Sequence, residues 1–302
     1  MVPMNVSEEL VKDCLETLGC RVEGFPQTYL GLPLSHEKLK LSTFAPYIAK
    51  TDRYLAGWQA MLLNPMGRAV LINAVLDSQL IYIMCAVPLP PGTLTQVDRR
   101  RRSFLWSGED NVSGVRCLVA WEQVCTDKDQ GGLGIRDLEL QNTCLLLKLI
   151  HRLHHQASSS WASWVRRYVC IAHMEGELSG HHWDSLRSLL PLYRAITTVE
   201  LGDGCTTSFW FDAWYSEDSL AERYPVLLSH CKQASITVHD AVNTGIQQLL
   251  VPRLTPQAQA ELLQVTHILQ GTVLAHTPDT RRSPFADENG KLKTSMLYKL
   301  LK

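Results

Sequence analysis

The sequence has 302 residues, of which 45% are hydrophobic and 20% are charged, with 29 Lys and Arg against 30 Asp and Glu. This composition is that of a globular protein and excludes wholesale disorder, and the length predicts two domains of roughly 150 residues each. The net charge of −1 excludes a protein that is basic over its whole surface. Positive charge is instead local, because residues 36–106 hold nine Lys and Arg but four Asp and Glu.

The first half of the chain predicts a short strand followed by helices. Residues 25–34 form an apolar segment with prolines near both ends and a glycine inside, which is typical of a strand and turn. Apolar residues at 44–62 recur at three- and four-residue spacing, as on one face of an amphipathic helix. Asn64-Pro65 predicts the start of a second helix, which ends at the prolines of 88–91. Further helices are predicted from Thr93 and from Asp137.

The second half of the chain is less regular. A serine-rich stretch at 158–160 marks a change in the sequence pattern, and we place a domain boundary there. Residues 197–201 and 206–211 flank Gly202-Asp203-Gly204, which predicts a β-hairpin. A last helical stripe follows at 258–269. The predicted fold is therefore α+β and predominantly α-helical.

The composition also bears on the compartment. Residues 78–97 carry no charge but contain prolines and glutamines, so we expect no membrane span and no membrane partner. Residues 1–12 have no apolar core typical of a secretory signal. The nine cysteines form no C-x-x-C pairs, which favours reduced thiols. We expect an intracellular protein, in the nucleus or the cytoplasm.

Six groups of residues occur in one order along nearly the whole chain. They are Tyr29-Leu30-Gly31-Leu32-Pro33-Leu34, Trp58, Gly67-Arg68 with Leu71-Ile72-Asn73, Phe104-Leu105-Trp106, Trp121 with Gly131-Gly132-Leu133-Gly134-Ile135, and Phe209-Trp210-Phe211-Asp212-Ala213-Trp214. In this order they resemble the carboxy-terminal half of reverse transcriptases from plant LINE-class, non-LTR retrotransposons. The resemblance covers roughly residues 4–302.

This resemblance implies a division of the chain. Residues 1–35 would be a residual palm edge with the primer-grip strand and turn, and 36–157 the helical thumb and connection. Residues 158–285 would form a second helical domain with the β-hairpin near 197–211. Residues 286–302 would begin a truncated zinc-binding reverse transcriptase domain that stops before its ligands.

Reverse transcriptases use an aspartate pair after a tyrosine, and a third aspartate upstream, to hold two divalent metal ions. This sequence has no Asp-Asp dipeptide, and Tyr215-Ser216-Glu217-Asp218 matches that motif only superficially. We therefore expect no polymerase activity from this chain alone, no catalytic or metal-binding residues and no cofactor, although the intact parent would need Mg²⁺ or Mn²⁺. The expected partner is an RNA–DNA or DNA duplex rather than a small molecule. A missing palm would have to come from another chain.

The candidate nucleic-acid-binding residues form two groups. The resemblance implies that Tyr29, Leu30 and Gly31 belong to the primer grip, where a glycine lets the backbone approach a phosphate and a tyrosine can contact a sugar. The alternative is an ordinary apolar strand. The second group lies within residues 36–106, which we call the basic island. It comprises Lys50, Arg53, Arg68, Arg99, Arg100, Arg101 and Arg102. The four consecutive arginines predict either a phosphate clamp or a solvated helix face.

Two alternative functions stay open. Cys170, His173, His181 and His182 form a C-x2-H-x7-H-H string, and His151 lies four residues before His155, a spacing that can share a metal ion. Neither set has the two ligand pairs of a zinc finger, so a zinc-binding protein is the weaker alternative. The other is a helical interaction module of the same ancestry with no nucleic-acid role. The tryptophans lie on apolar faces and are predicted to be core residues.

Overall fold

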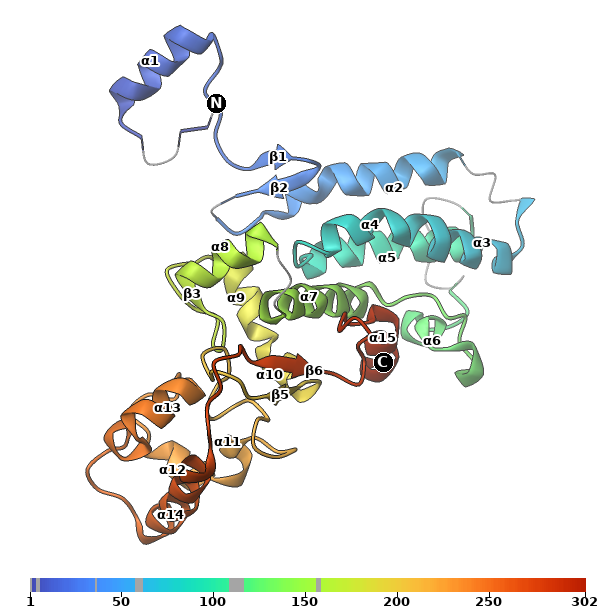
Figure 1. Cartoon of the computed structure of the whole chain (residues 1–302). Helices are drawn as coiled ribbons and strands as arrows, with labels where there is room; N and C mark the ends of the chain where they lie inside the picture. The colour runs from blue at the N-terminus through green and yellow to red at the C-terminus, as the bar shows by residue number, and fades with distance from the viewer. Residues whose placement is uncertain (1, 4–5, 36, 58–61, 109–116, 156–158) are drawn as a thin grey trace. The chain divides into compact units, whose positions relative to one another are not determined.

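The computed structural model describes the chain except for residues 1, 4–5, 36, 58–61, 109–116 and 156–158. It is predominantly helical, and its short strands form antiparallel pairs (Figure 1), which confirms the predicted α+β class. The backbone divides into two compact units. The first is Met1–Glu139 with Gly180–His182, and the second is Leu140–Ser179 with Trp183–Lys302.

The first unit is a set of helices preceded by a small hairpin. The helices are α1 (Glu8–Leu18), α2 (Ala45–Gly57), α3 (Pro65–Leu71), α4 (Asp77–Met84), α5 (Pro91–Trp106) and α6 (Trp121–Cys125), and β1 (Gln27–Tyr29) pairs with β2 (Leu32–Leu34). The Asn64 side chain caps α3 by accepting a hydrogen bond from the Gly67 N–H, with Pro65 at the first helical position, as the sequence predicted. A π-helical turn at Ile72–Leu76 joins α3 to α4.

The core of the first unit surrounds a buried arginine. Arg101 of α5 has no solvent exposure, and its guanidinium pairs with Asp77 at 3.1 Å and with Asp98 one turn earlier on α5. The same guanidinium donates to the Arg136 carbonyl at 2.6 Å and lies 5.3 Å from the centre of the Trp121 ring. It therefore ties α4, α5 and α6 to the segment that leads into the next helix.

The second unit is also mainly helical. Its helices are α7 (Leu138–His154), α8 (Ser160–Tyr168), α9 (His181–Ser188), α10 (Leu190–Ala195), α11 (Leu220–Arg223), α12 (Pro225–Ser229), α13 (Val238–Thr244), α14 (Pro256–Gly271) and α15 (Thr294–Leu301). Strand β3 (Val169–Cys170) pairs with β4 (Glu175–Gly176), and β5 (Thr198–Glu200) pairs with β6 (Thr280–Arg282). The units divide in the first turn of α7, between Glu139 and Leu140, rather than at 158–160, because the buried face of α7, including Leu147 and Ile150, packs in the core of the second unit.

Two apolar clusters make up this second core. One gathers the inward faces of α7 to α10, with Tyr193 and Trp183 among its members. The other is built around Phe209 and Trp210, both fully buried, with side chains from α11 to α14. The Phe-Trp-Phe-Asp-Ala-Trp motif therefore supplies core side chains.

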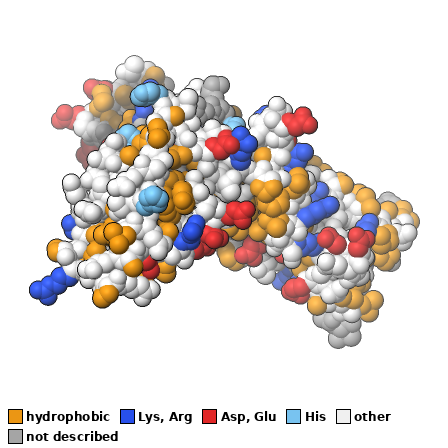
Figure 2. Space-filling view, turned by 60° about the horizontal axis from the view of Figure 1, so that its bottom comes forward, with side chains coloured by type: hydrophobic (Ala, Val, Ile, Leu, Met, Phe, Trp, Pro, Cys, Tyr) orange, Lys and Arg blue, Asp and Glu red, His pale blue; other side chains and the backbone are white. Residues whose placement is uncertain are grey.

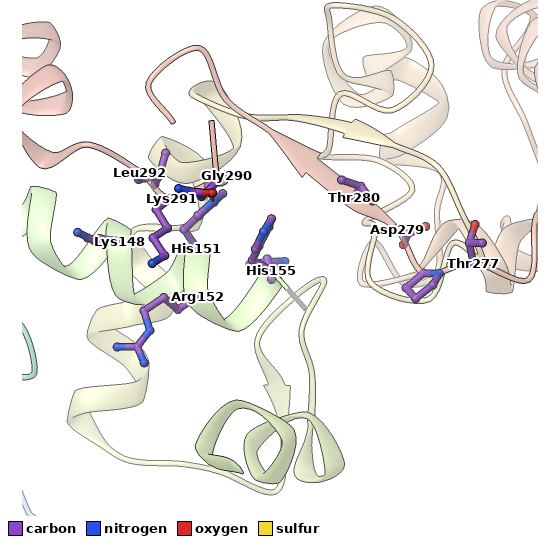
Figure 3. A pocket seen from close by; sticks show the side chains of 13 residues that line it. Lys148, His151, Arg152, His155, Thr277, Asp279, Thr280, Gly290, Lys291 and Leu292 are labelled. Carbon is purple, nitrogen blue, oxygen red and sulfur yellow. Dashed lines mark hydrogen bonds between the residues drawn. The ribbon is translucent and has the colours of Figure 1, made fainter. Parts of the chain in front are cut away.

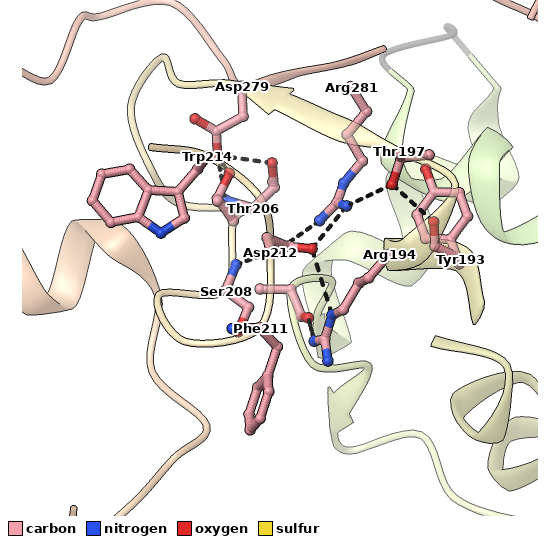
Figure 4. A network of polar contacts seen from close by, with 12 residues as sticks. Tyr193, Arg194, Thr197, Thr206, Ser208, Phe211, Asp212, Trp214, Asp279 and Arg281 are labelled. Atoms are coloured by element: carbon pink, nitrogen blue, oxygen red, sulfur yellow. Dashed lines mark hydrogen bonds and ion pairs between the residues drawn. The ribbon is translucent and has the colours of Figure 1, made fainter. Parts of the chain in front are cut away.

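Two buried carboxylates organise the loop after β5 (Figure 4). One Asp279 oxygen accepts the N–H groups of Gly202 and Gly204, and the other accepts from Thr206 and Thr207. Asp212 forms a bidentate pair with Arg281 at 2.9 and 2.6 Å. These contacts hold the loop against β6.

This loop explains why the predicted hairpin at 197–211 is wrong. The strand at Thr198–Glu200 is present, but its partner is Thr280–Arg282 and not residues 206–211. The chain between them turns around the Asp279 carboxylate, so its N–H groups bond to that side chain and not to a neighbouring strand. A Cβ at Gly202 would lie 2.1 Å from the Thr277 carbonyl oxygen, so glycine is required for this close approach.

Replacing Arg101 tests the buried ion pair of the first unit. R101Q leaves Asp77 buried without its partner, so we expect the free energy of unfolding to fall by about 3–5 kcal/mol. The matched control is R100Q, which removes the exposed pair of Arg100 with Asp52 and is expected to cost within about 1 kcal/mol. Urea titration followed by circular dichroism measures both. Equal effects of the two substitutions would contradict this assignment.

The loss of stability in R101Q is expected to depend on pH. Burial raises the pKa of Asp77 to about 6, against the opposing charge of Arg101, and losing Arg101 raises it further. A carboxyl whose folded pKa lies above its unfolded value stabilises the fold below the unfolded pKa, and that stability is lost as pH rises through the folded pKa. The deficit of R101Q relative to the wild type should therefore be smaller near pH 5 than near pH 7.

Replacing Asp279 tests the loop of the second unit. Burial alone would raise the pKa of Asp279, but the hydrogen bonds from Thr207, Gly202, Gly204 and Thr206 hold it below its ordinary value. D279N should lower the free energy of unfolding by about 2–4 kcal/mol at neutral pH. Because a lowered pKa gives stability that is lost as pH falls below the unfolded value, about 3.9, the difference from the wild type should shrink in acid. A pH-independent difference in melting temperature would contradict this account.

Candidate nucleic-acid interface

The tip of the β1–β2 hairpin is fixed by two tyrosines from distant parts of the first unit. The Tyr82 hydroxyl donates to the Leu30 carbonyl at 2.8 Å, and the Tyr47 hydroxyl donates to the Gly31 carbonyl. Burial, with a smaller contribution from Tyr82, raises the pKa of Tyr47, so this hydroxyl stays a donor at neutral pH. The turn residues Leu30 and Gly31 have φ values of +50° and +79°, and glycine adopts the second without strain.

Fixing the turn carbonyls leaves the side chains of the tip in solvent. The Tyr29 side chain is 62% exposed and that of Leu30 is 74% exposed. Such exposure of large side chains is unexpected for an ordinary apolar strand, which would bury one face. The predicted strand and turn at 25–34 is present, and its exposed tip can contact a ligand.

Three of the predicted cations also reach the surface of the first unit. Lys50 and Arg53 are exposed on α2 and lie three residues apart, so they share one side of that helix. Arg99 is exposed on α5. Because α2 carries both Tyr47 and these two cations, the Tyr47 hydrogen bond to Gly31 links the hairpin tip to the helix that bears Lys50 and Arg53.

The remaining arginines of the run have other partners. Arg100 forms a two-point pair with Asp52 of α2, with a distance of 3.0 Å from Nη2 to Oδ2. The half-buried Arg102 guanidinium lies 5.5 Å from the centre of the Trp121 ring. Both charges are thus partly used within the protein, although neither side chain is fully buried.

The structure corrects the expectation of phosphate contact for two residues. Arg101 is fully buried in the network around Asp77, so its guanidinium cannot meet a duplex at the surface. Arg68 is also buried and donates to the Leu105 carbonyl at 3.3 Å. Of the four consecutive arginines, Arg99 alone is exposed, because consecutive residues sweep all faces of a helix.

The surface charge is mixed. On the face drawn in Figure 2, basic and acidic side chains are interspersed and several hydrophobic side chains reach the surface. On this face, contact with phosphate would depend on a few cations rather than on a broad basic field.

Cys170 and His173 of the candidate zinc string lie in one turn, where the His173 N–H donates to the Cys170 carbonyl at 3.3 Å. His173 is buried, and its Nε2 bonds to the Ile236 carbonyl at 2.9 Å, whereas Cys170 is exposed. His151 and His155 stack at 5.5 Å between ring centres (Figure 3). Within the part of the chain that the structure describes, no group of three or more His, Cys, Asp or Glu side chains is arranged to hold a metal ion. None of the described helices is long and apolar enough to cross a membrane.

The tryptophans divide between the core and the surface. Trp121 and Trp210 are buried, as predicted. Trp161 and Trp164 of α8 are 39% and 50% exposed, so the prediction that they are core residues is wrong. The apolar stripe of α8 has a buried side at Ala162 and Val165, which leaves the indole rings beside it in solvent. Trp58 lies outside the described residues.

Sequence reasoning missed the two tyrosines that hold the hairpin tip. Tyr47 and Tyr82 lie on apolar helix faces, and nothing nearby in the sequence pairs them with a turn at Leu30 and Gly31. It also missed Asp279, whose five donors come from residues more than seventy positions earlier. A local pattern cannot show such long-range pairs.

Comparison with known proteins shows relatives in plants. The chain is 28% identical over 203 residues to a putative ribonuclease H protein of Arabidopsis thaliana, an alignment that covers 63% of this chain and 32% of the relative. It is 29% identical over 145 residues to an uncharacterized mitochondrial protein of the same plant, covering 46% of this chain and 94% of that protein. The chain thus spans about a third of the length of the first relative. No family model matches the sequence.

Proposed function

We propose that this chain derives from a plant retroelement reverse transcriptase of the LINE class, and that its first unit holds a primer–template duplex. The observation that carries the proposal is the hairpin tip, where Tyr29 and Leu30 face solvent next to a helix with two exposed cations. The similarity to plant proteins, one of them named for ribonuclease H, supports the ancestry.

The interaction would depend on the backbone of the nucleic acid. Lys50, Arg53 and Arg99 would contact phosphates, and Tyr29 would lie against a sugar or a base. Such contacts carry no base-edge recognition, so binding would be independent of sequence. Three phosphate contacts give weak binding compared with proteins that neutralise six or more phosphates.

The proposal does not extend to ribonuclease activity. The ribonuclease H name is that of the relative, and the alignment covers 32% of that protein.

A second candidate function rests on α8. Trp161 and Trp164 are exposed on this short helix, and Tyr168 lies on it as well with 39% of its surface exposed. Exposed aromatic side chains of this kind are enriched at protein interfaces, which favours an interaction module. This candidate predicts no affinity for a duplex.

Salt dependence of duplex binding tests the leading proposal. Fluorescence anisotropy of a labelled RNA–DNA hybrid across a salt series gives a slope that reports the number of phosphates neutralised. The triple variant K50Q/R53Q/R99Q should flatten that slope by roughly 0.9 for each phosphate lost. R101Q should leave the slope unchanged wherever it remains folded, because the Arg101 side chain is buried.

The matched control removes three exposed cations outside the basic island. The variant R167Q/R253Q/K299Q has the same change in net charge and should keep the wild-type slope. Equal flattening in both triple variants would contradict a specific phosphate-binding surface on the first unit. Absence of binding at low salt would favour the interaction module.

Polymerase activity gives a further check. We expect the purified chain to show no nucleotide incorporation on a primed RNA template with Mg²⁺ or Mn²⁺, because it has no Asp-Asp pair to hold the metal ions. The control is heat-inactivated protein in the same assay. Incorporation above that background would contradict the prediction.

A further inference from the structure

The first unit has a long helical segment whose outer side is exposed. It consists of α3, the π-helical turn at Ile72–Leu76 and α4, which follow one another directly in the chain (Figure 1). The backbone angles of Leu71 and Asp77, which flank the π-helical turn, are those of a right-handed helix. The three parts therefore present their side chains as consecutive turns of one helical segment.

The exposed side chains of this region recur every four residues. Six of them, which we call the neutral stripe, are Leu62, Met66, Val70, Ala74, Ser78 and Tyr82. The exposed fractions of the four largest range from 48% for Met66 to 78% for Leu62. From Val70 to Tyr82, each stripe residue lies between two residues of the buried face, which are Ala69, Ile72, Leu76, Leu80 and Ile83. The neutral stripe is thus on the side of the helix that is turned away from the core.

This side of the helix has no charge. Residues 62–85 are all described, and the two charged residues among them, Arg68 and Asp77, are buried. The exposed positions of α2, by contrast, include Lys50, Asp52 and Arg53. A surface helix normally has charged residues on its outer face, whereas a helix that is apolar on all sides is normally covered. The neutral stripe therefore has the character of a contact surface.

The absence of charge restricts the class of partner. Nucleic acids and anionic lipid surfaces are bound through Lys and Arg, which the neutral stripe does not contain. A strongly charged protein surface would likewise lose its hydration there without gaining an ion pair. A second copy of the same stripe brings together two uncharged surfaces, so neither cost arises.

The sizes of the side chains along the stripe are complementary to those of a second copy. In a two-fold contact between antiparallel helices with Ala74 at the axis, residues equally distant from Ala74 on either side face each other. Val70 then faces Ser78 of the second copy, and Met66 faces Tyr82 of the second copy. The small side chain of Ala74 lets the helices approach, and the methionine sulfur meets an aromatic ring. The Tyr82 hydroxyl keeps its bond to Leu30, because the contact uses the exposed ring.

We propose that the neutral stripe is the interface of a symmetric homodimer, in which it pairs with itself about a two-fold axis at Ala74. The segment from Pro65 to Met84 is about 30 Å long at 1.5 Å per residue. An antiparallel helix pair in contact over this length buries on the order of 1,000 Å² in total, the lower limit for a specific interface. The dimer is therefore expected to dissociate on dilution. The inference is independent of duplex binding, because Lys50, Arg53 and Arg99 lie outside the stripe.

Sedimentation equilibrium of the full chain over a concentration series tests the dimer. The wild type should be a monomer when dilute and approach a dimer at high concentration. A74E and A74K each place two like charges opposite each other at the axis, so each should weaken association at least about tenfold. An equimolar mixture of A74E and A74K should restore the dimer, because opposite charges then meet at the axis.

The matched control is A49E, which adds the same charge at an exposed alanine of α2 and should associate as the wild type does. A circular dichroism melt of each variant checks the fold. If A74E unfolds because Ala74 lies in the π-helical turn, V70E tests the same interface from α3 and should also weaken association.

Three results would overturn the proposal. The first is a wild-type protein that stays monomeric at every concentration. The second is association of folded A74E or V70E with the affinity of the wild type, which would assign the contact to another surface such as α8. The third is failure of the A74E and A74K mixture to form a dimer. K50Q/R53Q/R99Q should dimerise as the wild type does, so a loss of duplex binding in that variant is a separate outcome.

Discussion

The first unit depends on one buried charge. Arg101 is a guanidinium without solvent exposure, and its position requires Asp77, Asp98 and the Arg136 carbonyl around it. A charge in such a place is tolerated only when it is paired and hydrogen-bonded, so these groups must come together as the helices pack. The same requirement fixes how the neighbouring arginines are arranged. With Arg101 inside, Arg99 is exposed, Arg100 pairs with Asp52 and Arg102 lies over the Trp121 ring.

This arrangement reduces the number of cations in the basic island that are available at the surface. Nine cations in residues 36–106 suggested a broad phosphate-binding surface, but part of that charge holds the fold together. Five of the nine cations are exposed, namely Lys38, Lys40, Lys50, Arg53 and Arg99, and the last three lie on two helices that pack within the first unit. The hairpin tip is attached to α2 through the Tyr47 hydroxyl. Duplex binding, as we propose it, would therefore use a small surface whose hairpin tip is held by Tyr47 of α2 and Tyr82 of α4.

The second unit uses buried charge differently. Asp279 accepts N–H and hydroxyl groups from one loop, and Asp212 pairs with Arg281 from β6. These contacts replace the strand pairing that the sequence predicted for that loop. His154 is also buried in this unit, but neither of its ring nitrogens has a hydrogen-bond partner among the described residues.

Short-range sequence patterns predicted the helices and the hairpin that form from residues close together in the chain. Apolar spacing and the Asn64-Pro65 pair gave α2 and the start of α3, and the bounded apolar segment gave the β1–β2 hairpin. The pairing of β5 with β6 escaped prediction because the two strands are separated by the whole of α11 to α14.

The candidate site was predictable only in part. The exposed positions of Tyr29, Lys50 and Arg53 agree with their being surface candidates, but no pattern distinguishes Arg101 from its neighbours in a run of four. Which arginine turns inward is decided by where Asp77 lies after folding. The exposed indole rings of α8 illustrate the same limit, since an apolar stripe does not show how much of it is covered.

Hydrogen exchange with and without an RNA–DNA hybrid tests the central claim most directly. At low salt, the account predicts slower exchange at the β1–β2 turn and along α2 and α5, with the rest of the described chain unchanged. The effect should disappear at high salt, because it depends on phosphate contacts. Protection confined to α8 or to the second unit, or no protection at any salt concentration, would contradict the claim that the first unit holds a duplex.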